Sequence, residues 1–230
     1  MGEGAEMKDH GMNVIFDMDG VIFDTERVFL ECCIPVAERL GLAGIEEVVR
    51  ECVGMTDEET HKKLRTRYGD NAPLEEFDQE VLKSFMERYE RSEIPVKEGV
   101  VALLEALKQK GAGIAIGSST RTDIVKMELR DAGLIDYFDV IVGGNLVKAS
   151  KPAPDVFLLA AEKLGADIRE CIIIEDSFNG VRAAHASGAT VFMVPDLLKP
   201  TEEIIALTDH VFDSLVDVQV WLEGELEDNE

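Results

Sequence analysis

The sequence predicts an α/β protein, a doubly wound parallel sheet with an inserted α-helical domain. Three observations support this fold class. Short β-branched runs alternate with helical segments, a glycine follows each of those segments, and residues 25–92 carry helical patterns without a strand pattern. Strands that alternate with helices of this length form a parallel sheet with helices on both faces.

Five short runs are predicted as buried parallel strands because they are apolar and rich in β-branched residues. They occupy residues 14–16, 114–116, 140–142, 172–174 and 191–194. A helical segment precedes each of the last four runs, and each segment ends at a glycine, the usual C-terminal stop of a helix. These glycines are Gly111, Gly133, Gly165 and Gly188.

The stretch between the first and second predicted strands is too long for a single crossover connection. We therefore expect a separate helical domain inserted after the first strand. The first residues are polar and Gly-rich and the last residues are acidic, so both ends are expected to be flexible. The predicted division is a core of residues 12–24 and 93–222, a helical domain of residues 25–92, and flexible termini at residues 1–11 and 223–230.

The composition is that of an ordinary globular protein, with 230 residues, 46% hydrophobic and 30% charged. Acidic residues outnumber basic ones 47 to 23, which gives a formal charge of −24. Such a surface repels nucleic acid and anionic membranes, so neither is an expected partner. The N-terminus lacks the apolar core of a signal peptide, and no apolar run reaches the roughly 20 residues that span a bilayer. Since the four cysteines have no metal-binding spacing, we expect a cytoplasmic protein with reduced thiols.

Polar side chains follow four of the predicted strands, at the edge of the sheet where chemistry gathers in open α/β folds. In chain order they are Asp17 and Asp19, then Ser118 and Ser119, then Lys151, then Glu175 and Asp176. Carboxylates that lie close together repel each other, and a bound cation usually offsets this repulsion. A hard divalent cation with oxygen ligands is most economically Mg²⁺.

Each of these groups also has a simpler interpretation. The Asp-x-Asp-Gly segment that begins at Asp17 could be only a turn. Ser119 or Thr120 could cap the following helix, although a hydroxyl and backbone N–H groups at a helix start also bind anions. A lone lysine such as Lys151 is usually solvated. The occurrence of all these groups at neighbouring strand ends favours a functional site.

Four segments, in order along the chain, resemble the motifs of the haloacid-dehalogenase-like hydrolases, in the branch that contains β-phosphoglucomutase and many small-metabolite phosphatases. The segments are DMDGVIFDT (residues 17–25), IGSS (116–119), SKPAPD (150–155) and IEDSFNG (174–180). The resemblance covers nearly the whole chain. It implies a Rossmann-like core, with the insertion forming a helical cap that closes over the core site.

The resemblance also implies a role for each matching residue. Asp17 would attack phosphorus as the nucleophile and form an aspartyl phosphate, and Asp19 would act as general acid and then as general base. The implied phosphate-binding residues are Ser118, Ser119 and Lys151. The implied Mg²⁺ ligands are Asp17, Asp19 through its backbone carbonyl, Asp176 and, directly or through water, Glu175.

Substrate choice is expected to lie in the cap, because the core motifs contact only the phosphoryl group. In β-phosphoglucomutase the similar cap loop carries an arginine that clamps a second phosphate, whereas this chain has Asp57 there. A carboxylate that faces a phosphate lowers affinity. The candidate substrate-binding residues in the cap are Gly54, Met55, Thr56 and Lys83; for Lys83 a solvated helix position is the alternative.

We therefore expect a Mg²⁺-dependent phosphatase that hydrolyses a small organic phosphate monoester, such as a sugar phosphate. A β-phosphoglucomutase-like sugar phosphomutase is the alternative. A signalling receiver module also carries an aspartyl phosphate at a strand end, but it has no helical insertion. A catalytically idle family member is a further alternative, although all the motif positions are filled. The expected partner is a small phosphorylated metabolite, and the expected state is a monomer.

Overall fold

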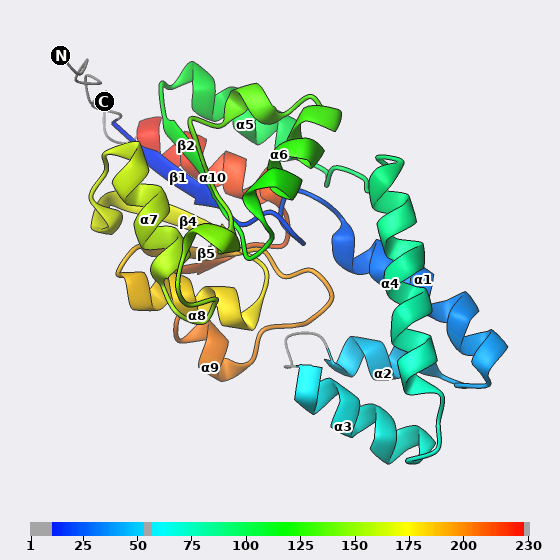
Figure 1. Cartoon of the computed structure of the whole chain (residues 1–230). Helices are drawn as coiled ribbons and strands as arrows, with labels where there is room; N and C mark the ends of the chain where they lie inside the picture. Colours follow the sequence, from blue (N-terminus) through cyan, green and yellow to red (C-terminus); the bar gives the residue numbers. More distant parts are fainter. Residues whose placement is uncertain (1–10, 53–56, 228–230) are drawn as a thin grey trace.

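The computed structural model describes residues 11–52 and 57–227 of the chain (Figure 1). Its centre is a parallel sheet of six strands in the order β3-β2-β1-β4-β5-β6. Later strands are added on both sides of the central β1, which is the doubly wound arrangement that the sequence predicts. The strands are β1 (Asn13–Phe16), β2 (Gly113–Gly117), β3 (Val140–Val142), β4 (Cys171–Glu175), β5 (Thr190–Met193) and β6 (His210–Val211).

Helices cover both faces of the sheet, because successive strand residues point to opposite sides. Val14 and Phe16 of β1 pack in one apolar cluster with α5, α6 and α10, whereas Ile15 packs in a second cluster with α7 and α8. All three side chains are fully buried. The helices of the core are α5 (Val100–Gln109), α6 (Thr122–Asp131), α7 (Asp155–Leu164), α8 (Phe178–Ser187), α9 (Glu202–Ile205) and α10 (Leu215–Glu227), with short 3-10 turns η1 (Ile135–Tyr137), η2 (Gly144–Leu146) and η3 (Ile168–Glu170).

The glycines predicted to end four of these helices lie just past them. Gly111, Gly133, Gly165 and Gly188 have φ angles of +72°, +71°, +76° and +84°. Residues with a side chain rarely adopt this left-handed conformation, so the prediction of these helix ends is confirmed.

The C-terminal part contains one strand that the sequence did not predict. The edge strand β6 was not predicted, because two residues are too short to show a strand period; the Asp209 carboxylate ties this segment to β5 by accepting the Val191 N–H at 2.7 Å. The helix α10 continues to Glu227, and the expected flexibility of residues 223–230 stays a prediction. Val218 and Leu222 bury one face of α10, and glutamate is a good helix former even in an acidic tail.

Between β1 and β2 the chain forms a helical insertion of four helices, and among its described residues there is no strand. Figure 1 shows these helices standing apart from the layers that cover the sheet. The two connecting segments run side by side: the Asp24 N–H donates to the Pro95 carbonyl, and the Lys97 N–H donates to the Ile22 carbonyl, both at 2.9 Å. The insertion consists of α1 (Thr25–Leu40), α2 (Ile45–Cys52), α3 (Asp57–Tyr68) and α4 (Leu74–Glu90). None of the helices described, in the insertion or the core, is long and apolar enough to cross a membrane.

Glu128 of α6 is a buried carboxyl where α4 leads back to the core. Glu128 is 7% exposed, and neither of its carboxyl oxygens has a hydrogen-bond partner among the described residues. It borders a small cavity of about 180 Å³ together with Tyr89 and apolar residues of the connecting segments. Burial raises the pKa of Glu128 to about 8; Tyr89 opposes the shift, and repulsion from Asp19 and Asp131 adds to it.

We expect Glu128→Gln to raise the free energy of unfolding at alkaline pH and to change it little in acid. The unfolded carboxyl ionises near its ordinary pKa of 4.5, whereas the folded one keeps its proton up to about 8. The folded state therefore binds more protons in this window, and wild-type stability, full below the window, falls as the pH rises through it. The gain at the alkaline end should be about 1–3 kcal/mol. Urea unfolding at both ends of the window measures it. Exposed Glu105→Gln is the control, and an equal effect at both pH values would contradict the expectation.

Candidate active site

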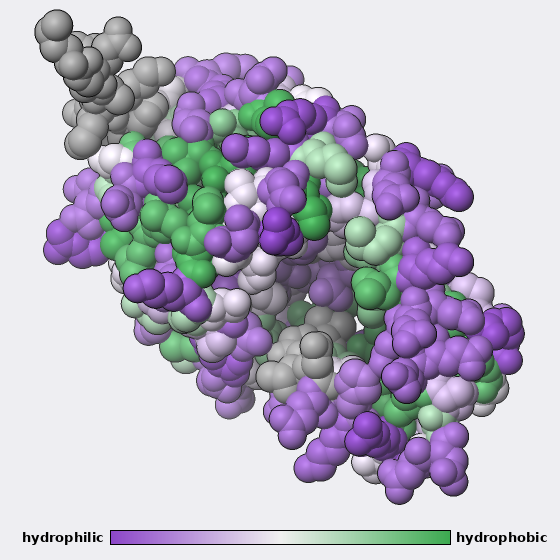
Figure 2. All heavy atoms as spheres, viewed as in Figure 1, coloured by the Kyte–Doolittle hydropathy of each residue, from purple (hydrophilic) through white to green (hydrophobic). Residues whose placement is uncertain are grey.

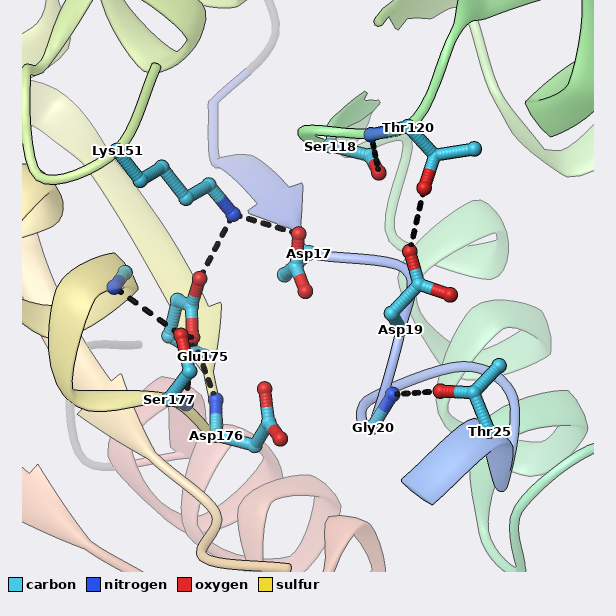
Figure 3. Close-up of polar contacts among 11 residues, drawn as sticks. Asp17, Asp19, Gly20, Thr25, Ser118, Thr120, Lys151, Glu175, Asp176 and Ser177 are labelled. Carbon is cyan, nitrogen blue, oxygen red and sulfur yellow. Dashed lines mark hydrogen bonds and ion pairs between the residues drawn. The ribbon is translucent and has the colours of Figure 1, made fainter. Parts of the chain in front are cut away.

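The polar groups that follow β1, β2, β3 and β4 lie together at one edge of the sheet (Figure 3). Lys151 lies between two carboxylates: its Nζ donates to Asp17 Oδ1 at 2.6 Å and to Glu175 Oε1 at 2.7 Å. The three side chains are 7%, 8% and 0% exposed, respectively. Lys151 is therefore a buried cation within an acidic cluster, and the alternative of a solvated surface lysine is wrong.

Glu175 is held on every side by donors. Its Oε2 accepts the backbone N–H groups of Asp176 and Ser177, each at 2.8 Å, and the Ser177 hydroxyl at 3.0 Å. The Ser177 hydroxyl also accepts the Gly180 N–H at the start of α8, so the helix cap and the carboxylate share one residue. This network fixes Glu175, and Glu175 in turn orients Lys151.

Gly180 lies so close to Glu175 that any side chain at that position would displace the carboxylate. A Cβ added at Gly180 would lie 1.6 Å from Glu175 Oε1. We expect Gly180→Ala to lower kcat/KM by about 10²-fold or more, because Glu175 and then Lys151 must move by about an ångström. Hydrolysis of an aryl phosphate measures the loss, with near-UV circular dichroism to verify folding.

The matched control is Gly224→Ala in α10, where an added Cβ meets nothing within 4 Å. That variant should keep full activity. Wild-type activity in Gly180→Ala would show that the position of Glu175 does not matter to the reaction.

Three of the carboxylates form a group that could hold a metal ion. Asp17, Glu175 and Asp176 each offer an oxygen atom, and these atoms lie within 4.8 Å of one another. Asp176 Oδ1 is buried without a hydrogen-bond partner among the described residues. One lysine cannot neutralise three buried carboxylates, so a hard divalent cation with oxygen ligands fits this site.

The titration of the cluster reflects the same excess of negative charge. Burial raises the pKa of Asp17 to about 7; Lys151 opposes the shift, and Glu175 and Asp19 add to it. Burial, followed by repulsion from Glu175 and Asp17, also raises the pKa of Asp176 well above its ordinary value. A bound cation would favour the ionised form of both groups.

Asp19 points away from this group of three, toward the loop after β2. Its Oδ2 accepts the Thr120 hydroxyl at 2.8 Å. Burial raises the pKa of Asp19, whereas contacts with Thr120, Lys151 and Ser118 oppose the shift. Asp19 therefore tends to retain a proton, which suits a general acid. The carboxyl of Asp19 is not in the group of three, and a metal-binding role for its backbone carbonyl stays a prediction.

The loop after β2 differs in part from expectation. Ser118 is fully buried and its hydroxyl accepts the Thr120 N–H at 3.0 Å, whereas Ser119 is exposed. The helix α6 begins later, at Thr122, and neither Ser119 nor Thr120 caps it. The capping interpretation is therefore wrong, and the sequence reasoning missed Thr120 as the partner of Asp19.

The segment after β1 is both a turn and part of the site. The Ile22 N–H donates to the Met18 carbonyl at 2.8 Å, which closes a turn around Asp19 and Gly20. Gly20 has a φ of +78°, and a Cβ there would lie 2.1 Å from Asp176 Oδ2, so only glycine fits between the two acidic loops.

Two residues that the sequence reasoning did not assign hold this turn in place. The Thr25 hydroxyl accepts the Gly20 N–H at 3.1 Å, and Lys97 Nζ donates to the Gly20 carbonyl at 2.7 Å. The threonine ends the first motif, so its place could have been noticed. A lysine beyond the insertion gives no such signal.

Of the four substrate-binding candidates in the cap, Lys83 alone lies among the described residues. Lys83 of α4 has an exposed side chain, as the alternative interpretation expects. The other three, Gly54, Met55 and Thr56, lie outside the described residues.

Comparisons with known proteins agree with this geometry. The family model described as haloacid dehalogenase-like hydrolase matches residues 14–194. A phosphorylated carbohydrates phosphatase of Thermotoga maritima is 35% identical over 175 residues, which cover 76% of this chain and 81% of that protein. The fructose-1-phosphate phosphatase YqaB of Escherichia coli is 29% identical over 184 residues, which cover 79% of this chain and 95% of that protein.

A solved structure has the same fold. It is a HAD family hydrolase from Deinococcus radiodurans R1 with bound phosphate and sodium, and it superposes with a TM-score of 0.80 at 26% identity, covering 93% of this chain and 96% of that one. The matched family model spans every strand of the sheet except β6, as well as the acidic cluster. The chain therefore belongs to the haloacid dehalogenase-like hydrolases.

Proposed function

We propose that this chain is a Mg²⁺-dependent phosphatase that hydrolyses a small phosphorylated metabolite through an aspartyl phosphate on Asp17. The observation that carries the proposal is the buried contact of Asp17 with Lys151 beside Glu175 and Asp176, with Asp19 across the same space. Relatives named as phosphatases of phosphorylated carbohydrates and of fructose 1-phosphate support the substrate type.

The first step is attack on phosphorus by a carboxylate oxygen of Asp17. A bond forms between this oxygen and phosphorus while the bond from phosphorus to the leaving oxygen breaks, and Asp19 gives its proton to that oxygen. Asp19 then takes a proton from a water molecule whose oxygen attacks the phosphorus of the aspartyl phosphate. Phosphate leaves and the Asp17 carboxylate is regenerated.

Lys151 and the loop after β2 supply positive charge and donors for the phosphoryl oxygens. Lys151 is fixed by Glu175, so its ammonium group does not need to reorganise during the reaction. The Ser118 hydroxyl lies at the same edge of the sheet and provides a further donor. When bound by Asp17, Asp176 and Glu175, Mg²⁺ would offset the negative charge that the transferring phosphoryl group brings to this acidic site.

The helical insertion serves as a cap in this proposal. It stands beyond the edge of the sheet that carries Asp17, and the two connecting segments are joined by backbone hydrogen bonds (Figure 1). Such a unit can approach and leave the core as one body, and a closed cap would exclude water from the phosphoryl group.

The test is release of inorganic phosphate from 4-nitrophenyl phosphate and from a panel of phosphorylated sugars, polyols and nucleotides, with and without Mg²⁺. We expect hydrolysis that depends on Mg²⁺. A coupled assay for glucose 6-phosphate formed from β-glucose 1-phosphate distinguishes a mutase from a phosphatase. Turnover there that exceeds phosphate release would replace the proposed function with a sugar phosphomutase.

A further inference from the structure

A cavity of about 450 Å³ is lined by helices α1 to α4 of the insertion, and Asp19 of the core is part of its wall. Figure 2 shows the surface hollowed between these two parts of the molecule. In the proposed function Asp19 protonates the leaving oxygen, so the group attached to that oxygen must occupy this cavity. The volume is typical of a site for a small metabolite.

The lining of this cavity is apolar and acidic. Phe29, Leu64, Phe77 and Phe85 supply apolar surface, whereas Glu26 and Asp78 add carboxylates to that of Asp19. No lysine, arginine or histidine is among the described lining residues.

The basic residues nearby are engaged elsewhere. Lys97 pairs with Asp196 at 3.1 Å and binds the Gly20 carbonyl, and Arg27, exposed on the other side of α1, pairs with its own neighbours on the helix. A second phosphate or a carboxylate on the substrate would therefore face Asp19, Glu26 and Asp78, and the described lining residues offer it no lysine or arginine. Such an unpaired buried anion is strongly disfavoured.

Glu26 is the lining carboxylate that remains open to a ligand. No hydrogen bond or ion pair joins it to another residue that the structure describes, whereas Asp78 Oδ2 lies 2.6 Å from His61 Nε2. Glu26 and Phe29 are three residues apart in α1 and so share the helix face that lines the cavity. The ring of Phe29 contacts that of Phe85 edge to face, with centroids 5.7 Å apart.

The surroundings of Glu26 favour a cation over a neutral donor. Burial, together with repulsion from Asp196 and Asp19, raises the pKa of Glu26 to about 7. The attraction of Lys97 opposes this shift. A neighbouring ammonium group would stabilise the ionised form, and the faces of the two aromatic rings attract cations as well.

We propose that the substrate is a phosphomonoester whose leaving group carries a protonated amine and no second anionic group, and that Glu26 selects it. This inference rests on the proposed function and specifies its substrate class. An amino alcohol or amino sugar phosphate has this chemistry. Phosphorylated carboxylic acids and sugar bisphosphates are the substrates that the same cavity rejects.

Matched substrates test the inference, because within each set they differ chiefly in the charge that the leaving group carries. The first set is phosphoethanolamine, 2-hydroxyethyl phosphate and phosphoglycolate, and the second is glucosamine 6-phosphate, glucose 6-phosphate and glucose 1,6-bisphosphate. We expect kcat/KM to fall from the amine to the hydroxyl compound and again to the anionic compound, by about tenfold or more at each step.

Glu26→Gln should remove the advantage of the amine within each set, mainly through a higher KM for the amine compound. The control is Glu38→Gln, an exposed position farther along α1. Anionic compounds hydrolysed as well as the amines, or a full amine preference in Glu26→Gln, would overturn the inference. If no compound of either set and no aryl phosphate is hydrolysed, the proposed function itself fails.

Discussion

Asp17→Asn is expected to lower kcat for phosphate release by about 10⁴–10⁶-fold, because a carboxamide cannot replace the carboxylate as the attacking group. The substitution keeps the shape of the side chain and removes one negative charge from a buried cluster of three carboxylates and one lysine. Folding should therefore be unharmed, and the melting temperature should not fall. Loss of activity with retained stability would separate a chemical role for Asp17 from a structural one.

The covalent step has its own measurement. Acid quenching of the wild-type protein with ³²P-labelled substrate should leave label on the chain, and Asp17→Asn should carry none. Asp136→Asn, exposed in η1, is the control and should match the wild type in both assays. Native turnover by Asp17→Asn would exclude the aspartyl-phosphate mechanism, whatever its effect on stability.

The fold could be predicted largely because the inner strands of the sheet are buried on both faces, and the edge strand β3, although half-buried, is apolar throughout. A parallel strand of this kind shows as a short apolar run, and β1 to β5 all do so. The edge strand β6 is half-buried and two residues long, so it has neither the length nor the composition of the others. The extent of α10 depended on Val218 and Leu222 packing against the core, a tertiary contact that the acidic composition of the tail conceals.

The site residues that could be predicted are those that lie directly at the end of a strand. Asp17 and Glu175 each lie at the carboxyl end of a strand, so the order of strands brings them together. Lys151 comes from a loop, and its buried position depends on Glu175 being present to receive it. Thr120 could not be assigned from sequence, because a hydroxyl before a helix serves equally as a cap or as a partner for another side chain, and only the path of the loop decides.

Removal of the divalent cation is expected to abolish hydrolysis, and addition of Mg²⁺ to restore it. Without a cation, Asp17, Glu175 and Asp176 share one lysine, and Asp176 Oδ1 has no partner among the described residues. A phosphoryl group would add further negative charge to this site, so neither binding nor transfer should proceed.

The same site gives a readout that does not depend on activity. Mg²⁺ at about 100 times its dissociation constant should stabilise the folded chain by about 2.7 kcal/mol, seen as a higher melting temperature. Because burial holds the pKa of Asp17 and Asp176 above the usual range, Mg²⁺ binding should release protons, and its affinity should increase with pH. Asp176→Asn should lose both the activity and the stabilisation, whereas exposed Asp136→Asn should keep both. If Mg²⁺ stabilises Asp176→Asn as much as the wild type, the cation binds elsewhere, and its role at the acidic cluster must be abandoned even if the enzyme requires it.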